Sequence, residues 1–290
     1  MRSLTAIRAF WFPPQFTQKP SLMAPYNFDA LDADVILRSS DGKELRVHRL
    51  ILSLSSPVFQ GMFGLPQPTD PSDPSQIPTI DVADTSDILE PFIQHLYPKS
   101  SPKVADIQTW AALYAIADKY SAEAVMELLR DILIPQFLEA SPLRVYALAS
   151  RWGFEEEAKA ASRRTLAMDI FKDFPREDAE LMGGVACQRL LFLHFNRRQA
   201  AQDLVAKHPL PSSPPDDSSC PCTPNYNRIV PALTRRMGST PWLTAEELIE
   251  EIPKWNYLYP CRETCRNSTK NTYQYFSTLL EGISILPQTI

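Results

Sequence analysis

The segment between Asp34 and Phe63 constrains the fold of this chain more than any other stretch of the sequence. On both sides of the pair Asp41-Gly42, hydrophobic residues alternate with polar ones, at Val35, Leu37, Leu45 and Val47. Alternation of period two is typical of half-buried strands, and an Asp-Gly pair tolerates the positive φ angle of a tight turn. The segment therefore predicts a β-hairpin.

Two short helices are expected directly after the hairpin. The first begins at His48-Arg49 and the second at Ser56-Pro57. A serine side chain can cap the first backbone N–H groups of a helix, and proline suits the first helical position. Gly64 is a suitable stop for the second helix.

Most of the remaining chain has helical spacing. Apolar residues recur at three and four positions, which places them on one face of a helix. Helices are expected over residues 88–96, 110–120, 142–152, 155–168, 181–205, 244–252 and 268–280. A Thr-x-x-Glu capping box opens the helix at Thr244.

These residues, taken in order, resemble the BTB (POZ) domain family. The N-terminal half of the resemblance rests on Asp34-Val35, Gly42, Val47-His48-Arg49, Leu52, Ser56, Val58-Phe59 and Met62-Phe63. The C-terminal half rests on Thr79-Ile80-Asp81-Val82, Phe92, Leu96-Tyr97, Leu113, Ala117-Asp118-Lys119-Tyr120 and Leu128. The opening Asp32-Ala33-Asp34-Val35 and the pair Tyr97-Pro98 are similar to those of BTB proteins from mushroom-forming fungi, the basidiomycetes.

The resemblance implies an α+β fold, in which a small mixed β-sheet is flanked by α-helices and followed by an all-α extension. The expected organisation is a disordered leader at 1–28, a BTB/POZ domain at 29–138, a helical extension at 139–206, a linker rich in proline and serine at 207–226, and a C-terminal helical tail at 227–290 that docks on the body. A proline-rich insertion at 64–78 lies inside the domain.

The first 28 residues contain no acidic side chain and include the aromatic run Phe10-Trp11-Phe12. Arg8 interrupts the apolar stretch that a secretory signal needs. The segment is interpreted as a disordered leader, or as an extension upstream of a natural start at Met23. A mitochondrial presequence is the alternative.

Composition excludes several classes of function. A net charge of −5 and a pI of about 5.5 argue against nucleic acid as a direct partner, because phosphate binding needs clustered Lys and Arg. No apolar run reaches the roughly 18 residues of a membrane span. Five cysteines, an odd number, favour a reducing compartment over a disulfide framework. An intracellular location, in the cytoplasm, the nucleus or both, is therefore expected.

The expected function is non-catalytic. The resemblance implies a scaffold that binds other proteins, including itself as a homodimer, through BTB-mediated oligomerisation. The alternative is a substrate adaptor for a cullin-type ubiquitin ligase. Adaptors of the family commonly carry a hydrophobic-x-Glu contact in the loop that corresponds to Gly64–Pro78, and this loop contains no glutamate.

Asp34 and Arg49 occupy motif positions that form a charged pocket in the family, often at the dimer interface. If the two side chains pair in a buried setting, deleting one costs about 3–5 kcal/mol, because the other charge is left unpaired. Either they pin the hairpin to the first helix within one subunit, or they contact a partner directly. His48 between them is interpreted as a helix-start histidine rather than a ligand or base.

A candidate dimer or partner face follows from the same resemblance. Helices at this position cannot direct every apolar side chain inward. The residues expected on the face are Leu50, Leu54, Val58, Phe59 and Met62. The proline-rich leader does not supply the N-terminal helix and strand that BTB transcription factors exchange, so a strand-swapped dimer is not expected.

Neither an active site nor a cofactor is expected, with one alternative. The chain has no phosphate-binding glycine loop and no Gly-x-Ser-x-Gly or His-Glu-x-x-His motif. Cys220, Cys222, Cys261 and Cys265 supply four thiolates, the ligand set of a structural zinc ion. Cys-x-Cys is, however, a tighter spacing than the usual Cys-x-x-Cys. The competing interpretation is four unpaired thiols in loops.

Overall fold

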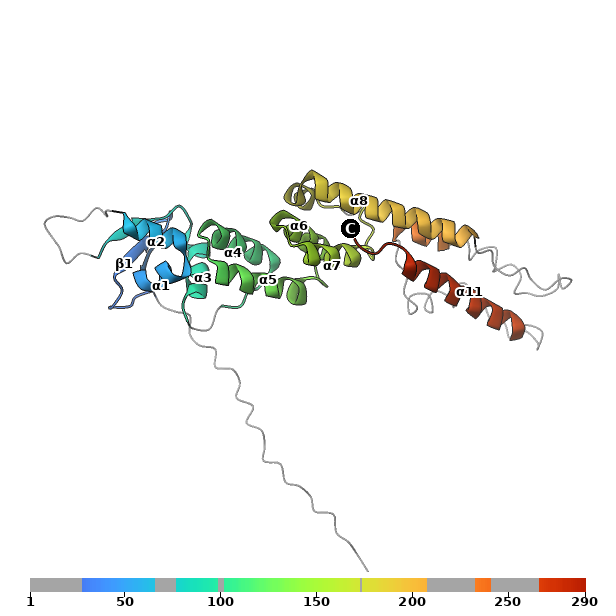
Figure 1. The fold of residues 1–290 in the computed structure, drawn as a ribbon, viewed down its shortest axis with the longest axis horizontal. Coiled ribbons are helices and arrows are strands. Elements are labelled where there is room, and N and C mark those ends of the chain that lie inside the picture. The colour runs from blue at the N-terminus through green and yellow to red at the C-terminus, as the bar shows by residue number, and fades with distance from the viewer. Residues whose placement is uncertain (1–27, 66–76, 99–101, 173, 208–232, 241–265) are drawn as a thin grey trace, which may run out of the picture. The chain divides into compact units, whose positions relative to one another are not determined.

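The computed structural model describes residues 28–65, 77–98, 102–172, 174–207, 233–240 and 266–290, which are drawn in colour in Figure 1. Backbone contacts divide the chain into two compact units. The first comprises Met1–Lys103 and Ala115–Val125, and the second comprises Val104–Tyr114 and Met126–Ile290. Helices α4 (Ile107–Lys119) and α5 (Glu123–Phe137) contribute residues to both.

The first unit contains a three-stranded mixed sheet with the strand order β2-β1-β3. Strand β1 (Val35–Arg38) pairs antiparallel with β2 (Glu44–Val47) and parallel with β3 (Thr79–Asp81). The side chains of the predicted alternation, Val35, Leu37, Leu45 and Val47, are all buried. The hairpin prediction is therefore confirmed, and the periodicity correctly identified the face that turns toward the core.

The hairpin turn is built around Gly42, whose φ angle is +84°, a conformation that favours glycine. The backbone N–H of Gly42 donates to the Ser39 carbonyl at 2.9 Å, and the Ser39 hydroxyl bonds to Lys43. Asp41 in the same turn reaches a helix. Its carboxylate accepts from the Ser86 backbone N–H at 2.9 Å and from the Ser86 hydroxyl at 2.6 Å. The turn therefore caps α3 (Ser86–Leu96).

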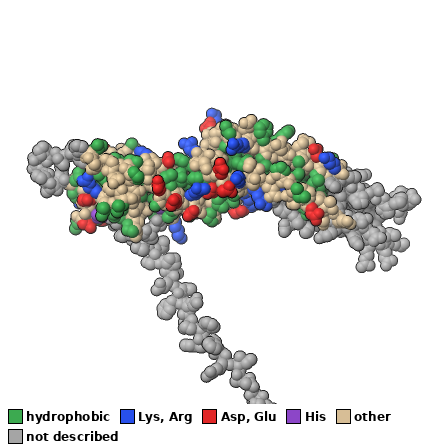
Figure 2. Space-filling model, in the orientation of Figure 1, with side chains coloured by type: hydrophobic (Ala, Val, Ile, Leu, Met, Phe, Trp, Pro, Cys, Tyr) green, Lys and Arg blue, Asp and Glu red, His purple; other side chains and the backbone are tan. Residues whose placement is uncertain are grey.

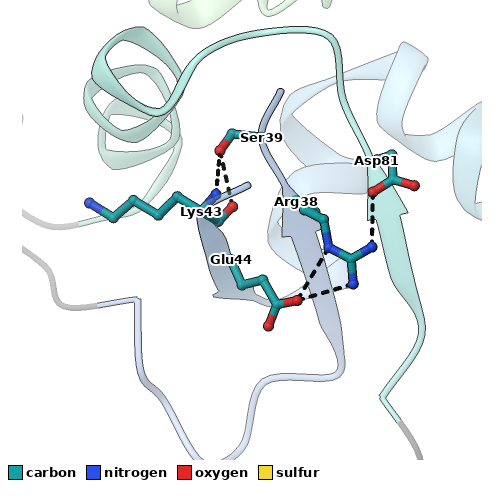
Figure 3. A network of polar contacts seen from close by, with 5 residues as sticks. All are labelled: Arg38, Ser39, Lys43, Glu44 and Asp81. Atoms are coloured by element: carbon teal, nitrogen blue, oxygen red, sulfur yellow. Dashed lines mark hydrogen bonds and ion pairs between the residues drawn. The ribbon is translucent and has the colours of Figure 1, made fainter. Parts of the chain in front are cut away.

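A polar contact network crosses the sheet (Figure 3). Arg38 on β1 donates to Glu44 on β2 at 3.1 and 3.3 Å, and to Asp81 on β3 at 3.4 Å. All three side chains are substantially exposed, so the network adds little to stability. It does mark one polar side of a sheet whose other side is apolar.

Helices α1 (Arg49–Ser55), α2 (Pro57–Gly64) and α3 add further side chains to the apolar core of the first unit. The buried side chains that these helices contribute are Leu52, Phe59, Phe63, Leu89, Phe92, Ile93 and Leu96. A small mixed sheet with flanking helices is thus confirmed. Pro57 stands at the start of α2 as expected, whereas Gly64 is its last helical residue and Leu65 follows as the C-cap.

In the second unit, residues of α4 and α5 pack directly on the helices that follow. Trp110 on α4 donates its indole N–H to the Leu129 carbonyl of α5 at 2.7 Å. The Tyr114 ring lies 5.4 Å from that of Phe154, and Arg130 pairs with Glu157 at 2.6 Å. These contacts agree with the grouping of parts of α4 and α5 in one unit with the helices that follow.

The helical extension consists of α6 (Pro142–Trp152), α7 (Glu155–Thr165) and α8 (Arg176–Lys207), which confirms the all-α extension. Gly153 ends α6 with a φ angle of +73°, the left-handed C-terminal conformation. Within α8, Gly183 has non-helical angles, φ +76° and ψ 166°, so the helical run is kinked there.

Helix α11 (Arg266–Ile285) lies along α8, as Figure 1 shows, and residues 233–239 form a further short helix. Their shared core is formed by Ala201, Val205, Leu233, Met237, Leu279 and Ile283. A Cβ placed on Gly282 would lie 2.7 Å from Leu204 Cδ2, so glycine permits the close approach of α11 to α8.

Several expectations concern residues outside the described part of the chain. They are the leader up to residue 27, most of the proline-rich insertion, the linker from residue 208, the helix expected from Thr244, and the four cysteines of the zinc hypothesis. Among the helices that the structure describes, none is both long and apolar enough to cross a membrane.

Candidate interaction surface

Asp34, immediately before β1, caps the first helix. Its Oδ1 accepts a hydrogen bond from the backbone N–H of Arg49 at 2.7 Å. That N–H belongs to the first residue of α1 and has no partner inside the helix. His48, the N-cap residue, makes no capping bond of its own through its side chain. The carboxylate also places a negative charge at the positive end of the helix.

The Arg49 side chain points to the end of α2 instead of to Asp34. Its guanidinium donates to the Phe63 carbonyl at 2.5 Å and lies 5.2 Å from the centre of the Phe63 ring. This contact satisfies a carbonyl at a helix C-terminus, where a cation is favourable. Arg49 therefore joins the start of α1 to the end of α2.

The two side chains of the expected charged pocket therefore contact backbone groups within the single chain. Asp34 and Arg49, both in the described part of the chain, make no ion pair with each other. The Asp34 carboxylate instead contacts the backbone N–H of Arg49, which has no partner inside the helix. The Arg49 guanidinium contacts the Phe63 carbonyl. The interpretation that they pin the hairpin to the helix within one subunit agrees with these contacts.

His48 lies at the helix start, as expected. Its backbone N–H donates to the Tyr97 hydroxyl at 3.0 Å, and its Nδ1 lies 3.0 Å from the same oxygen. Its Nε2 faces Asp32 at 3.4 Å. These contacts tie the start of α1 to the segment after α3 and leave His48 in a structural role.

Ser56 fixes the angle between α1 and α2. Its hydroxyl accepts from the Phe59 N–H at 3.1 Å and donates to the Tyr120 carbonyl at 2.5 Å. The Tyr120 hydroxyl donates to Asp84 at 2.6 Å. Burial, together with that bond and the Asp84 charge, raises the pKa of Tyr120, so the phenol stays protonated. The junction of the two helices is therefore held by a buried hydrogen bond to Tyr120, 64 residues further along the chain.

With α1 held in this way, part of its surface remains apolar and open to solvent. Leu50 is 68% exposed and Leu54 is 80% exposed. Because they stand four residues apart on one helix, they share a face. Val58 and Met62 on α2 are half-buried. Figure 2 shows that hydrophobic side chains, in green, reach the visible surface among the charged ones.

Phe59 does not belong to this face, and its assignment to it was wrong. The side chain is fully buried. Its ring stacks on Tyr120 with centroids 4.5 Å apart and on Phe63 at 6.0 Å. The helical face that carries Phe59 turns inward because Ser56 bonds to Tyr120 and brings the two rings together. The expected face is reduced to Leu50, Leu54, Val58 and Met62.

Sequence reasoning missed Leu31, which is almost fully exposed in the turn before β1. Its neighbour Asp32 contacts His48, two residues before Leu50. The available signal was a single large apolar residue between Ala30 and Asp32, in a turn too short to bury it. One isolated leucine is a weak signal, because folded proteins commonly expose single apolar residues.

The environments of His95 and His194 are set by their own local contacts. The His95 ring bonds to the Pro91 carbonyl, and burial lowers its pKa. Burial first, and then Arg198 and Arg197, lower the pKa of His194 to about 4. Among the described residues there is no cluster of three or more His, Cys, Asp or Glu that could hold a metal ion.

Comparison with protein families gives one match. Residues 28–136 match the family described as the BTB/POZ domain. No curated protein matches the chain, so the similarity to fungal BTB proteins stays a prediction. The matched range includes the hairpin, both capped helices and the exposed face of α1. A BTB/POZ domain is therefore detected over residues 28–136, and this family generally serves as a protein-interaction module rather than a catalyst.

Proposed function

We propose that this chain is a non-catalytic interaction module that associates with a second copy of itself through the outward face of α1. The observation that carries the proposal is the exposure of Leu50 and Leu54 on one face of a helix whose position is fixed by Asp34, Arg49 and Ser56. Rigid presentation lowers the entropy cost of binding, because α1 does not need to be ordered on contact.

Burial of this face in an interface is energetically favourable. Removing a leucine side chain from water is worth about 1.5–3 kcal/mol. In a twofold-symmetric dimer the same patch occurs on both copies, so each leucine contributes twice. Apolar side chains at the centre of an interface, with charged groups around them, are the usual arrangement of such surfaces. Arg49 and the Asp34 carboxylate, at the start of α1, supply charged groups beside the face of Leu50 and Leu54.

The test is the mass of the whole chain in solution, measured by size-exclusion chromatography with multi-angle light scattering. We expect a concentration-dependent dimer that dissociates in the double variant Leu50→Asp, Leu54→Asp. Phe195→Asp is the matched control, since Phe195 is an exposed apolar residue on α8 and lies outside the face. A monomer for the unmodified chain, or a dimer that survives the double variant, rejects self-association through α1.

The same variants separate this proposal from the cullin-adaptor alternative. Affinity purification of the whole chain with mass spectrometry identifies its partners. If a cullin scaffold is recovered and the chain is monomeric in solution, the adaptor function is supported and self-association is rejected. Recovery of the chain's own second copy, lost in the double variant, supports the proposal.

A further inference from the structure

A pocket of about 770 Å³ opens within the second unit among α6, α7 and α8. This volume lies in the range of about 300–1,000 Å³ that is usual for ligand pockets, which are also largely apolar. The apolar side chains that line it include Phe154, Met182, Val185, Phe192 and Leu193. The pocket therefore has the size and the lining of a site for a small molecule.

Part of the apolar wall is open to solvent. Val185 is 67% exposed and Phe192 is 55% exposed, although both line the pocket. They stand seven residues apart on α8, so they lie on one face of the helix, two turns apart. Large apolar side chains that face water along a concave surface gain free energy when an apolar group covers them.

Arg189 lies on the same face, between these two residues. It follows Val185 by four positions and precedes Phe192 by three, and it lines the same pocket. Its charge also acts on Tyr146, a lining residue of α6. Burial raises the pKa of the Tyr146 phenol, and the positive charge of Arg189 acts in the opposite direction. The guanidinium is therefore within electrostatic range of the α6 wall.

The charged side chains that line the pocket are Glu155, Lys159 and Arg189. Lys159 already has acidic partners on its own helix. It bonds to Glu156 at 2.8 Å, and this bond first, then the charges of Glu156 and Glu155, raise its pKa. The Arg189 guanidinium, by contrast, has no ion pair or hydrogen bond with any residue in the described part of the chain. Arg189 is thus the cation of this pocket that is available to an anion.

We propose that this pocket binds a small amphipathic carboxylic acid, with its apolar chain against Phe192 and Leu193 and its carboxylate on Arg189. The planar guanidinium presents its N–H donors in a fork that matches the two oxygens of a carboxylate. Removal of the apolar chain from water supplies the main driving force. The site shares no residue with the α1 face, so either proposal can be tested without the other.

The experiment is isothermal titration calorimetry of the whole chain at pH 7 with octanoate, octanol and octylammonium. The three probes have the same alkyl chain and differ in the charge of the head group. We expect octanoate to bind most tightly and octylammonium most weakly. Arg189→Gln should weaken octanoate binding by about two- to fivefold, the range of an exposed ion pair, and leave octanol binding unchanged. Arg176→Gln is the matched control, at an exposed arginine of the same helix that does not line the pocket.

A second pair of variants locates the alkyl chain. Phe192→Ser removes part of the apolar wall and should weaken binding of octanoate and of octanol several-fold. Phe195→Ser makes the same change at an equally exposed phenylalanine of α8 outside the pocket and should weaken neither.

Three results would each overturn the proposal. The first is that octanoate does not bind, or binds no more tightly than octanol. The second is octanoate binding that Arg189→Gln and Arg176→Gln change equally. The third is octanoate binding that Phe192→Ser does not weaken, because the probe then lies elsewhere. Circular dichroism checks that each variant is folded. If Phe192→Ser does not fold, the comparison of Arg189→Gln with Arg176→Gln decides the question.

Discussion

The Asp34 carboxylate accepts a hydrogen bond from the backbone N–H of Arg49 at 2.7 Å and makes no ion pair with the guanidinium of the same residue. The two residues are therefore linked through the backbone of α1. Asp41 repeats this arrangement at Ser86, the first residue of α3. Two aspartates of one hairpin thus cap two helices. This fixes the orientation of both helices relative to the sheet.

Removal of the Asp34 cap should have a small, well-defined cost. We expect Asp34→Ala to lower the free energy of unfolding by about 1 kcal/mol, the usual loss for a helix cap. Arg49→Met removes the bond to Phe63 and keeps the aliphatic stem. In a double-mutant cycle measured by urea unfolding, the coupling between the two changes should stay below about 0.5 kcal/mol. A larger coupling would indicate a direct ion pair, and Asp29→Ala, at an exposed acid nearby, serves as the control.

Asp41 should give the protein a specific dependence on acid. The hydroxyl of Ser39, then the bonds from Ser86, lower the pKa of Asp41 from 3.8 to about 2. Because the folded pKa is lowered, its stabilising contribution is complete above pH 3.8 and is lost as the pH falls through about 2. The stability difference between the unmodified chain and Asp41→Asn should therefore be constant above about pH 4 and shrink below it. Chemical unfolding at a series of pH values measures this difference. Asp118→Asn, at an exposed acid of α4, is the control. Its stability difference from the unmodified chain should not shrink in this way below about pH 4.

Two glycines of the second unit should respond to substitution with opposite signs. A Cβ on Gly184 would meet nothing within 4 Å, whereas one on Gly282 would lie 2.7 Å from Leu204. We expect Gly184→Ala to raise the free energy of unfolding by about 0.5–1 kcal/mol through helix propensity. Gly282→Val should lower it by about 1–3 kcal/mol, because the larger side chain forces α11 away from α8. Thermal unfolding followed by circular dichroism compares them, and a stabilised Gly282→Val variant would show that the helices are not closely packed.

Local features could be predicted well from the sequence alone. The alternation around Asp41-Gly42 identified both strands of the hairpin and the buried side of each. Ser56-Pro57 located the start of α2, and Gly153 located the end of α6. These features depend on a few neighbouring residues, so propensity and periodicity determine them.

The candidate site was predicted only in part. Leu50 and Leu54 lie exposed on one face, as expected, but Phe59 lies in the core. Helical spacing shows which residues share a face and does not show how the helix is rotated. The rotation of α2 is set by Ser56 and Phe59 meeting Tyr120, and Tyr120 lies 64 residues beyond Ser56 in the chain.

The sequence by itself determined the hairpin, the start of α2, the end of α6 and the resemblance to the BTB/POZ family over its N-terminal part. Only the tertiary structure decided where the charged side chains act. Arg49 meets the Phe63 carbonyl, and Arg197 meets carbonyls 86 to 90 residues further along. An arginine can bind any accessible oxygen, and which oxygen is accessible depends on how distant segments pack. That packing is a property of the whole chain, and no local pattern of residues encodes it.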